Sequence, residues 1–96
     1  MDLLVTYDIA DTDGEGARRL RRVHDLCSAY GHRVQLSVFE CRLSPAGYAA
    51  LRHELERLIN PGKDCVNIYR FSGSIVESKT TLGTPTTHEA GDAWII

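Results

Sequence analysis

Uncharged side chains occupy both faces of an extended chain over the first residues. The alternation places Leu3, Val5 and Tyr7 on one face, and Leu4 and Thr6 on the other. Cover on both faces is typical of a central strand of a sheet. We therefore predict a strand over residues 2–9, with Asp8 at the end where the chain leaves the sheet.

A helical period begins after this strand. Between residues 17 and 30 apolar side chains recur every three or four positions, at Ala17, Leu20, Val23, Cys27 and Tyr30. Thr12 and Glu15 have the spacing of a capping box before this segment, and Gly31 is a typical helix terminator after it. The pattern predicts a helix that buries one stripe against the strand.

The next alternation covers residues 33–41. Val34, Leu36 and Val38 fall on one face, whereas the opposite face mixes polar side chains with the large aromatic Phe39. A large aromatic among polar groups is unusual on a solvated face and typical of a partner surface. We predict one strand here, with Phe39 directed toward a partner.

A second helix and two strands are predicted downstream. Ser44 as N-cap and Pro45 in the first turn begin a helix that ends at residues 60–62. Residues 64–71 form a strand and residues 74–78 a short one. We assign these elements to an α+β fold, the ferredoxin-like βαββαβ sandwich, in which a four-stranded antiparallel sheet carries two helices on one face. The open face of so small a domain is typically a dimer interface.

The composition changes after the last of these strands. Residues 79–93 are poor in large apolar side chains and rich in Thr and Gly, which is typical of an extended linker. The chain nevertheless ends on Trp94 followed by two isoleucines, which need a buried place. We predict a ferredoxin-like domain over residues 1–78 and, over residues 79–96, a linker with a short C-terminal strand. That strand pairs with its own sheet or with a partner's.

The size of the chain limits the kind of site it can build. Ninety-six residues form one compact domain, so an active site is expected to be shallow or shared between copies. No apolar run approaches the roughly 18 to 20 residues that cross a bilayer. The start MDLLVTYD contains an acid too early for a signal peptide. We expect a cytoplasmic protein without membrane contact, whose Cys27, Cys41 and Cys65 are reduced and buried.

Positive charge is concentrated in one stretch. The formal net charge of −2 argues against a protein that coats nucleic acid by bulk electrostatics. Between residues 17 and 33, however, arginine greatly outnumbers acid, at Arg18, Arg19, Arg21, Arg22 and Arg33. A helix turns by about 100° per residue, which places Arg18 and Arg22 opposite the apolar stripe. The stretch predicts a phosphate-binding surface, although an ordinary solvated helix face has the same pattern.

Asp8 is the candidate for chemistry. An acid at the end of a strand, between Tyr7 and Ile9, costs desolvation free energy unless it caps a backbone group, pairs with a cation or holds a metal. One carboxylate is a weak magnesium site. Two copies of Asp8 related by a two-fold axis would form a better one, because Mg²⁺ accepts one or two carboxylates together with water and phosphate. Capping of the following loop is the alternative role.

Three features together resemble a known family over residues 1–78. They are V-T-Y-D-I at 5–9, the arginine-rich first helix, and G-H-R-V-Q-L-S-V-F-E-C at 31–41. The combination resembles the small CRISPR-associated adaptation proteins of the Cas2 family. The resemblance implies a ferredoxin-like homodimer joined through its open sheet faces, with Mg²⁺ or Mn²⁺ held between the two copies of Asp8. It also implies that Tyr7, Arg33 and Phe39 lie at the cleft, and that Arg19 or Arg22 matches an arginine of the first helix.

The resemblance implies two functions and does not choose between them. One is a metal-dependent endonuclease, acting on RNA or double-stranded DNA, with Asp8 as the catalytic and metal-binding residue. In this hypothesis the phosphates are held by Arg18, Arg19, Arg22 and Arg33, and the cleft or dimer contact by Tyr7 and Phe39. The alternative is a non-catalytic adaptor that binds duplex DNA and bridges the subunits of a larger CRISPR integrase during spacer acquisition.

Overall fold

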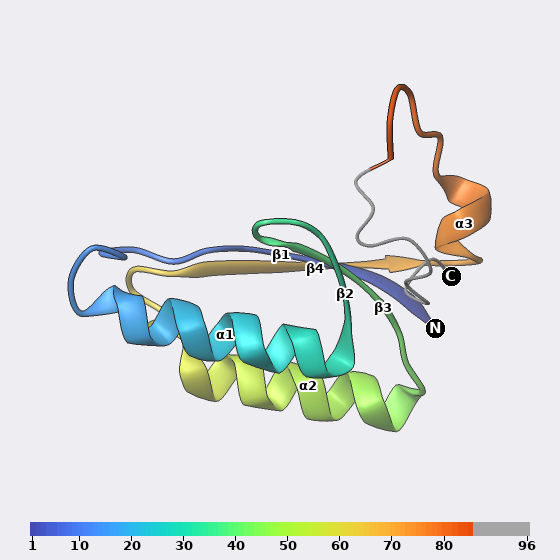
Figure 1. Cartoon of the computed structure of the whole chain (residues 1–96). Helices are drawn as coiled ribbons and strands as arrows, with labels where there is room; N and C mark the ends of the chain where they lie inside the picture. The colour runs from blue at the N-terminus through green and yellow to red at the C-terminus, as the bar shows by residue number, and fades with distance from the viewer. Residues whose placement is uncertain (86–96) are drawn as a thin grey trace.

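Seven helices and strands follow one another within residues 1–85, the part of the chain that this computed structural model describes (Figure 1). In chain order they are β1 (Asp2–Asp8), α1 (Gly16–Tyr30), β2 (Gly31–Gln35), β3 (Val38–Arg42), α2 (Pro45–Leu58), β4 (Cys65–Phe71) and α3 (Ile75–Ser78). The strands form one antiparallel sheet in the order β2-β3-β1-β4. Both long helices lie against one face of this sheet. The predicted α+β class and the βαββαβ order are confirmed.

The segment predicted as a single strand over residues 33–41 is a hairpin. β2 and β3 are joined by a turn at Leu36 and Ser37. Leu36 lies in this turn and is 80% exposed, whereas Phe39 pairs with Val5 on the helix-covered face and is fully buried, the reverse of the prediction. The elements placed from the sequence ran β-α-β-α-β-β, and the hairpin supplies the strand that the ferredoxin-like order requires between the helices.

The predicted strand over residues 74–78 is wrong, because Ile75–Ser78 is the short helix α3. Ser74 caps this helix: its Oγ accepts a hydrogen bond from the Val76 N–H at 3.0 Å. The Asp2 carboxylate accepts another from the Ile75 N–H at 2.8 Å. Both acceptors satisfy backbone donors that a helix start leaves without partners.

The start of α2 agrees with the prediction. The Ser44 Oγ accepts a hydrogen bond from the Gly47 N–H at 3.0 Å, and Pro45 is the first helical residue. Proline suits this position because its missing N–H would have no partner there. Leu51 and Leu55 are the buried residues of this helix.

The loop between β1 and α1 is closed by its own backbone rather than by the predicted capping box. The Glu15 side chain makes no capping bond. Asp11 adopts the left-handed conformation (φ 57°), and its carbonyl accepts hydrogen bonds from the N–H groups of Gly14 and Gly16 at 2.9 and 2.8 Å. A Cβ at Gly16 would collide with the Ala10 carbonyl oxygen, so the tight approach of this loop to α1 requires glycine.

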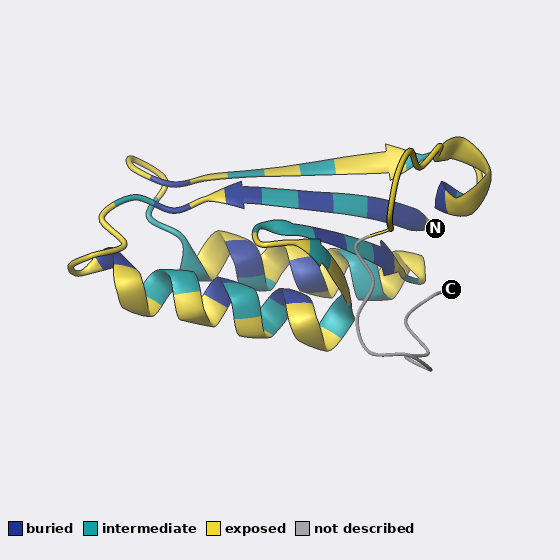
Figure 2. Cartoon of the chain, turned by 45° about the horizontal axis from the view of Figure 1, so that its top comes forward, coloured by how far each residue is buried: buried dark blue, intermediate teal, exposed yellow. Residues whose placement is uncertain are grey.

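The core lies between the sheet and the two long helices (Figure 2). Its fully buried side chains are Leu3, Val5, Val23, Cys27, Phe39 and Leu51. Burial raises the pKa of Cys27 to about 12 and that of Cys41 to about 11, so both thiols stay protonated. Cys65 is exposed, in contrast to the prediction that all three cysteines are buried.

The segment after α3 is described only in part. Residues 79–85 contain no helix or strand, and the predicted C-terminal strand with Trp94 lies outside the described residues. Within the described residues, no helix combines the length and the apolar character that crossing a membrane requires.

Candidate functional site

Asp8 is the last residue of β1, and its side chain is exposed. The alternation that buries Leu3, Val5 and Tyr7 directs Asp8 to the opposite, helix-free face of the sheet. Across the ladder it pairs with Cys65, the first residue of β4. Among the described residues the Asp8 carboxylate has no hydrogen bond or ion pair, so its oxygens remain available to a ligand.

The residues around Asp8 bear on the predicted metal. Within residues 1–85 no cluster of three or more His, Cys, Asp or Glu side chains is placed to hold an ion. Asp8 alone offers two carboxylate oxygens, which are hard donors of the kind that Mg²⁺ and Mn²⁺ prefer. The donor type therefore fits the metal, and the number of donors calls for a second copy of Asp8.

Tyr7 lies on the other face of β1 and is buried. Its hydroxyl is 3.4 Å from the Leu36 carbonyl oxygen, to which it donates, and 3.5 Å from the His24 Nδ1. Burial raises the pKa of Tyr7 to about 12, so the phenol stays neutral. Together with Arg33 it lines a groove between α1 and the β2–β3 turn, while Asp8 faces the opposite side of the sheet.

Phe39 does not form the cleft or dimer contact that was predicted for it. Its side chain is fully buried within the subunit. The ring stacks on Tyr7, with centroids 6.1 Å apart, and meets His24 edge-on at 5.6 Å. The physical reason is that Phe39 lies opposite the core residue Val5 in the β1–β3 ladder, so its side chain points to the face that the helices cover. Phe39 supports Tyr7 from within the core.

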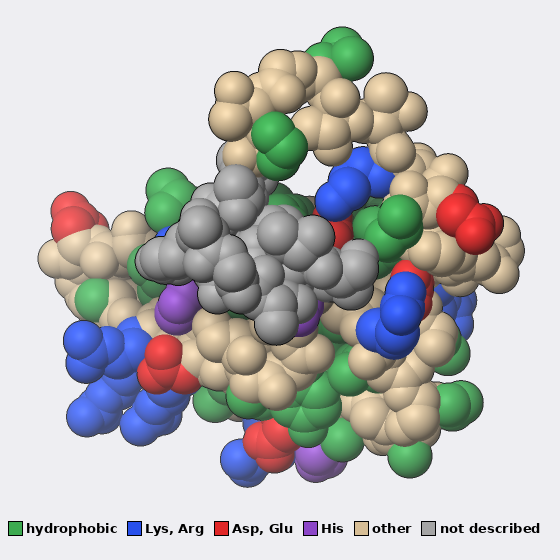
Figure 3. All heavy atoms as spheres, turned by 45° about the vertical axis from the view of Figure 1, so that its right-hand side comes forward, with side chains coloured by type: hydrophobic (Ala, Val, Ile, Leu, Met, Phe, Trp, Pro, Cys, Tyr) green, Lys and Arg blue, Asp and Glu red, His purple; other side chains and the backbone are tan. Residues whose placement is uncertain are grey.

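The arginines of α1 and β2 divide into two groups. Arg18, Arg22 and Arg33 are exposed, as is Arg21, which was not among the predicted site residues. Three of them, Arg18, Arg21 and Arg22, line one shallow depression on α1. Figure 3 shows Lys and Arg side chains gathered at one end of the molecule, at the lower left of the view. This exposed group has the character of a phosphate-binding surface.

Arg19 differs from its neighbours, because its guanidinium is bound inside the subunit. The Nε donates to Asp64 Oδ2 at 2.8 Å, and Nη2 donates to Asp64 Oδ1 at 3.2 Å. The Asp64 side chain is 0% exposed and that of Arg19 is 17% exposed. The predicted contact of Arg19 with nucleic acid would have to compete with this two-pronged pair.

Asp64 was missed by the sequence reasoning. It lies just before β4, where the sequence predicted only the first residue of a strand. The hydrogen bonds from Arg19, together with those from the backbone N–H groups of Asn60 and Ala10, lower its pKa to about 2, although burial acts in the opposite direction. No sequence signal marked it, since its partner Arg19 lies 45 positions away.

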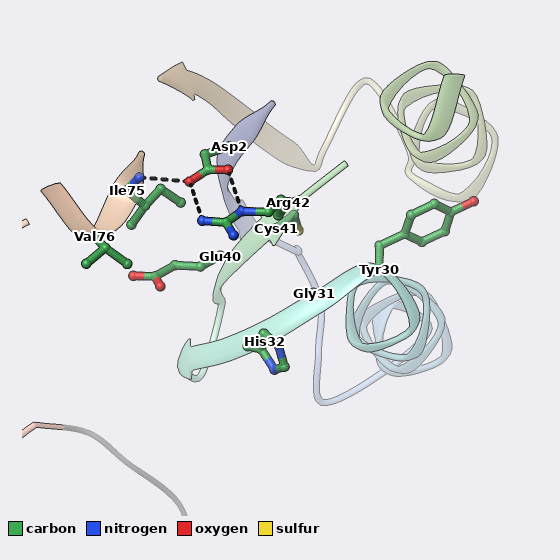
Figure 4. Close-up of a pocket in the computed structure, with 9 residues that line it drawn as sticks. All are labelled: Asp2, Tyr30, Gly31, His32, Glu40, Cys41, Arg42, Ile75 and Val76. Carbon is green, nitrogen blue, oxygen red and sulfur yellow. Dashed lines mark hydrogen bonds and ion pairs between the residues drawn. The ribbon is translucent and has the colours of Figure 1, made fainter. Parts of the chain in front are cut away.

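A second internal acid lies at the other end of β1. Figure 4 shows the Asp2 carboxylate between the Arg42 guanidinium and the backbone of Ile75. The Arg42 Nε donates to Asp2 Oδ1 at 3.1 Å. The hydrogen bond from Arg42, followed by that from the Ile75 N–H, lowers the pKa of Asp2. This acid holds α3 against the sheet and is not free for a ligand.

Comparisons with known proteins agree on one family. The family model described as CRISPR associated protein Cas2 matches residues 1–77. The chain is 46% identical over 69 residues to the CRISPR-associated endoribonuclease Cas2 of Nitratidesulfovibrio vulgaris, an alignment that covers 72% of this chain and 68% of the relative. It is 42% identical over 74 residues to the CRISPR-associated endonuclease Cas2 of Halalkalibacterium halodurans, which covers 77% of each.

A solved structure shows the same fold. The crystal structure of Streptococcus pyogenes Cas2 at pH 6.5 superimposes with a TM-score of 0.76 and 40% sequence identity. The match covers 86% of this chain and 100% of that chain. The likeness therefore extends over the sheet and both long helices.

Proposed function

Because the chain belongs to the CRISPR-associated Cas2 family, we propose that it is a CRISPR endonuclease that cleaves phosphodiester bonds as a homodimer, with Asp8 of both subunits at a divalent metal. The observation that carries the proposal is the exposed Asp8 carboxylate, which has no partner among the described residues. An acid left free at the end of an ordered strand is available for ligand chemistry. Relatives are named as an endoribonuclease and as an endonuclease, so RNA and duplex DNA are both candidate substrates.

The homodimer is supported by the helix-free face of the sheet. Strand register places Leu4 and Thr6 of β1 on this face with Tyr69 of β4. Tyr69 is 53% exposed, and Cys65 on the same face is also exposed. A partly apolar open sheet face suits an isologous contact, in which the same patch of two copies meets across a two-fold axis. Such a contact would bring two copies of Asp8 toward each other.

Different residues of this chain would bind the metal and the substrate. Asp8 would hold Mg²⁺ or Mn²⁺ through its carboxylate oxygens. When bound, the metal supplies an activated water and neutralises charge on the phosphate. Arg33, Arg18 and Arg22 would bind flanking phosphates through charge-assisted hydrogen bonds.

One observation favours a second candidate function. The exposed arginines of α1 lie in the helix layer, whereas Asp8 faces the opposite side of the sheet. A basic surface separated in this way could bind duplex DNA without contributing to cleavage. The chain would then act as a non-catalytic adaptor in spacer acquisition, with residues 1–78 as the DNA-binding domain and residues 79–96 as the segment that engages an integrase in the cytoplasm.

Cleavage by matched variants tests the proposal. Purified Asp8→Asn and Asp8→Ala proteins should cleave single-stranded RNA and duplex DNA at least about 100-fold more slowly than the wild type in Mg²⁺, because only interactions at the reacting phosphate are lost. Glu56→Gln is the control, since Glu56 is an exposed acid on α2. Wild-type rates in both Asp8 variants would exclude the catalytic proposal and favour the adaptor.

A further inference from the structure

The backbone immediately after Asp8 is held by two side chains from distant parts of the chain. Ala10, two residues beyond Asp8, donates its N–H to Asp64 Oδ1 at 3.0 Å. Its carbonyl oxygen accepts from Arg19 Nη2 at 3.2 Å. Both backbone polar groups of Ala10 are therefore hydrogen-bonded, one to each member of the buried ion pair.

The Asp64 carboxylate accepts four hydrogen bonds. Its Oδ2 accepts from the Arg19 Nε and from the Asn60 N–H, each at 2.8 Å, and its Oδ1 accepts from the Arg19 Nη2 and the Ala10 N–H. The donors come from α1, from the loop after β1 and from the loop before β4. Charge-assisted bonds in a buried place are among the stronger polar contacts in proteins. One carboxylate thus joins three segments at the end of β1 where Asp8 lies.

We infer that Arg19 and Asp64 form a clamp that fixes the direction of the Asp8 side chain, and that Arg19 is a positioning residue rather than a contact to nucleic acid. The inference rests on the proposed function of Asp8. The Arg19–Asp64 clamp acts through Ala10 and does not itself reach the substrate.

The rest of the loop leaves Asp8 little freedom to move. Ile9, between Asp8 and the clamped peptide, is 6% exposed and belongs to the core. On the far side of Ala10, the Lys63 Nζ binds Asp11 Oδ2 at 3.1 Å. The chain therefore leaves the sheet through Ile9, whose side chain is buried, and Ala10, whose N–H and C=O are both hydrogen-bonded. A metal held between two carboxylates needs both in place, and a shift of about 1 Å can lower a rate about 100-fold.

A purely stabilising role for the same ion pair makes different predictions. A stabilising pair would change the unfolding temperature and leave kcat and KM of the folded protein unchanged. A phosphate contact at Arg19 would raise KM and the salt dependence of binding and leave kcat unchanged. Positioning of Asp8 lowers kcat while KM stays near its wild-type value.

The test compares two arginines that are three residues apart on α1. Cleavage by full-length Arg19→Ala and Arg19→Lys is measured at saturating Mg²⁺, below the unfolding temperature of each variant. We expect kcat to fall about 10- to 100-fold in both, with KM within about twofold of the wild type. Lysine should not restore kcat, because one ammonium group cannot replace the two guanidinium nitrogens that bind Asp64 and Ala10. Arg22→Ala should raise KM instead, and Arg52→Ala, on the exposed side of α2, should change neither.

Amide hydrogen exchange provides a readout that does not need the metal. The N–H groups of Ala10 and Asn60 both donate to Asp64, so they should exchange faster in Arg19→Lys and Asp64→Asn and remain unchanged in Arg22→Ala. The double variant Arg19→Asp with Asp64→Arg swaps the two charges. It should restore neither the slow hydrogen exchange of these N–H groups nor kcat. Arginine at position 64 cannot accept the two backbone N–H bonds.

The outcomes separate this inference from the proposed function. A wild-type kcat in both Arg19 variants, or a rise in KM alone, would overturn the clamp while Asp8→Ala remained inactive. Full activity of Asp8→Ala would overturn the proposed function itself. Rescue by the exchanged pair would show that a charge pair alone suffices and would also overturn the clamp.

Discussion

The two aspartates at the ends of β1 lie in opposite environments. Asp2 and Asp8 are six positions apart on one strand, so they belong to the same face of the sheet. Asp2 is 8% exposed and accepts hydrogen bonds from Arg42 and from the Ile75 backbone. Asp8 is exposed, and within the described residues nothing binds it. The difference shows that the fold uses one carboxylate for structure and leaves the other without a partner among the described residues.

A third acid extends this comparison. Asp64 lies at the same end of the sheet as Asp8, and its carboxylate accepts four hydrogen bonds. Two structural acids therefore hold the two ends of β1, and the free acid lies beside one of them. Substitutions of the three acids should accordingly separate stability from activity.

The largest loss of stability is expected from Asp64→Ala. The substitution leaves Arg19 and the N–H groups of Ala10 and Asn60 without their acceptor. Removing one member of a buried pair costs about 3 to 5 kcal/mol of unfolding free energy. Urea unfolding followed by circular dichroism measures this unfolding free energy. A loss below about 1 kcal/mol would show that the Arg19–Asp64 pair contributes little to stability.

Acid should remove part of this stability without any substitution. The folded pKa of Asp64 is about 2, below the ordinary value of 3.8. Because the folded value is the lower one, the contribution is complete above pH 3.8 and is lost as the pH falls through 2. A shift of this size corresponds to about 2 kcal/mol. Unfolding free energies of wild type and Asp64→Asn between pH 5 and 2 should converge, and parallel curves would contradict the assignment.

A smaller effect is expected at the other end of the strand. Asp2→Ala removes acceptors from Arg42 and from the first N–H of α3, which should cost about 1 to 3 kcal/mol. The same substitution should leave the cleavage rate unchanged, because Asp2 lies at the opposite end of β1. Thermal unfolding and cleavage of the same preparation give both values. A lowered kcat with unchanged stability would reverse the roles assigned to the two ends.

The smallest effect on stability is expected at Asp8 itself. Removing an exposed carboxylate that has no partner within residues 1–85 should change the unfolding free energy of the subunit by less than about 0.5 kcal/mol. Monomeric protein at low concentration and without metal is the appropriate sample. A loss comparable to that of Asp2→Ala would mean that Asp8 is structural after all.

Local patterns explain which parts of this fold could be predicted. The strand that ends at Asp8, the helix before Gly31 and the cap at Ser44 depend on neighbouring residues, and each is present. Of the predicted helical stripe, Val23 and Cys27 are buried, whereas Ala17 is exposed. The hairpin was missed because Leu36 and Ser37 carry none of the usual turn residues. An uninterrupted alternation was therefore extended through the turn. Phe39 was assigned to a partner surface because its face also carries Arg33, whereas that face is the one the helices cover.

The role of Arg19 could not be predicted for a different reason. On the helix its position beside Arg18 and Arg22 suggests one basic surface, since periodicity shows only which way a side chain points. Its partner Asp64 is brought to it by the packing of β4 beside β1. Contacts between segments so far apart in sequence leave no local trace in a single chain.

Metal binding tests the central claim most directly. Titration of the wild-type protein with Mn²⁺, followed by electron paramagnetic resonance, should show one ion bound per two chains if the proposed dimer forms. Asp8→Ala should lose this binding and keep its unfolding free energy, whereas Asp2→Ala should keep the binding and lose stability. Unchanged Mn²⁺ binding in Asp8→Ala would contradict the account, because the free carboxylate at the end of β1 would then not be the ligand.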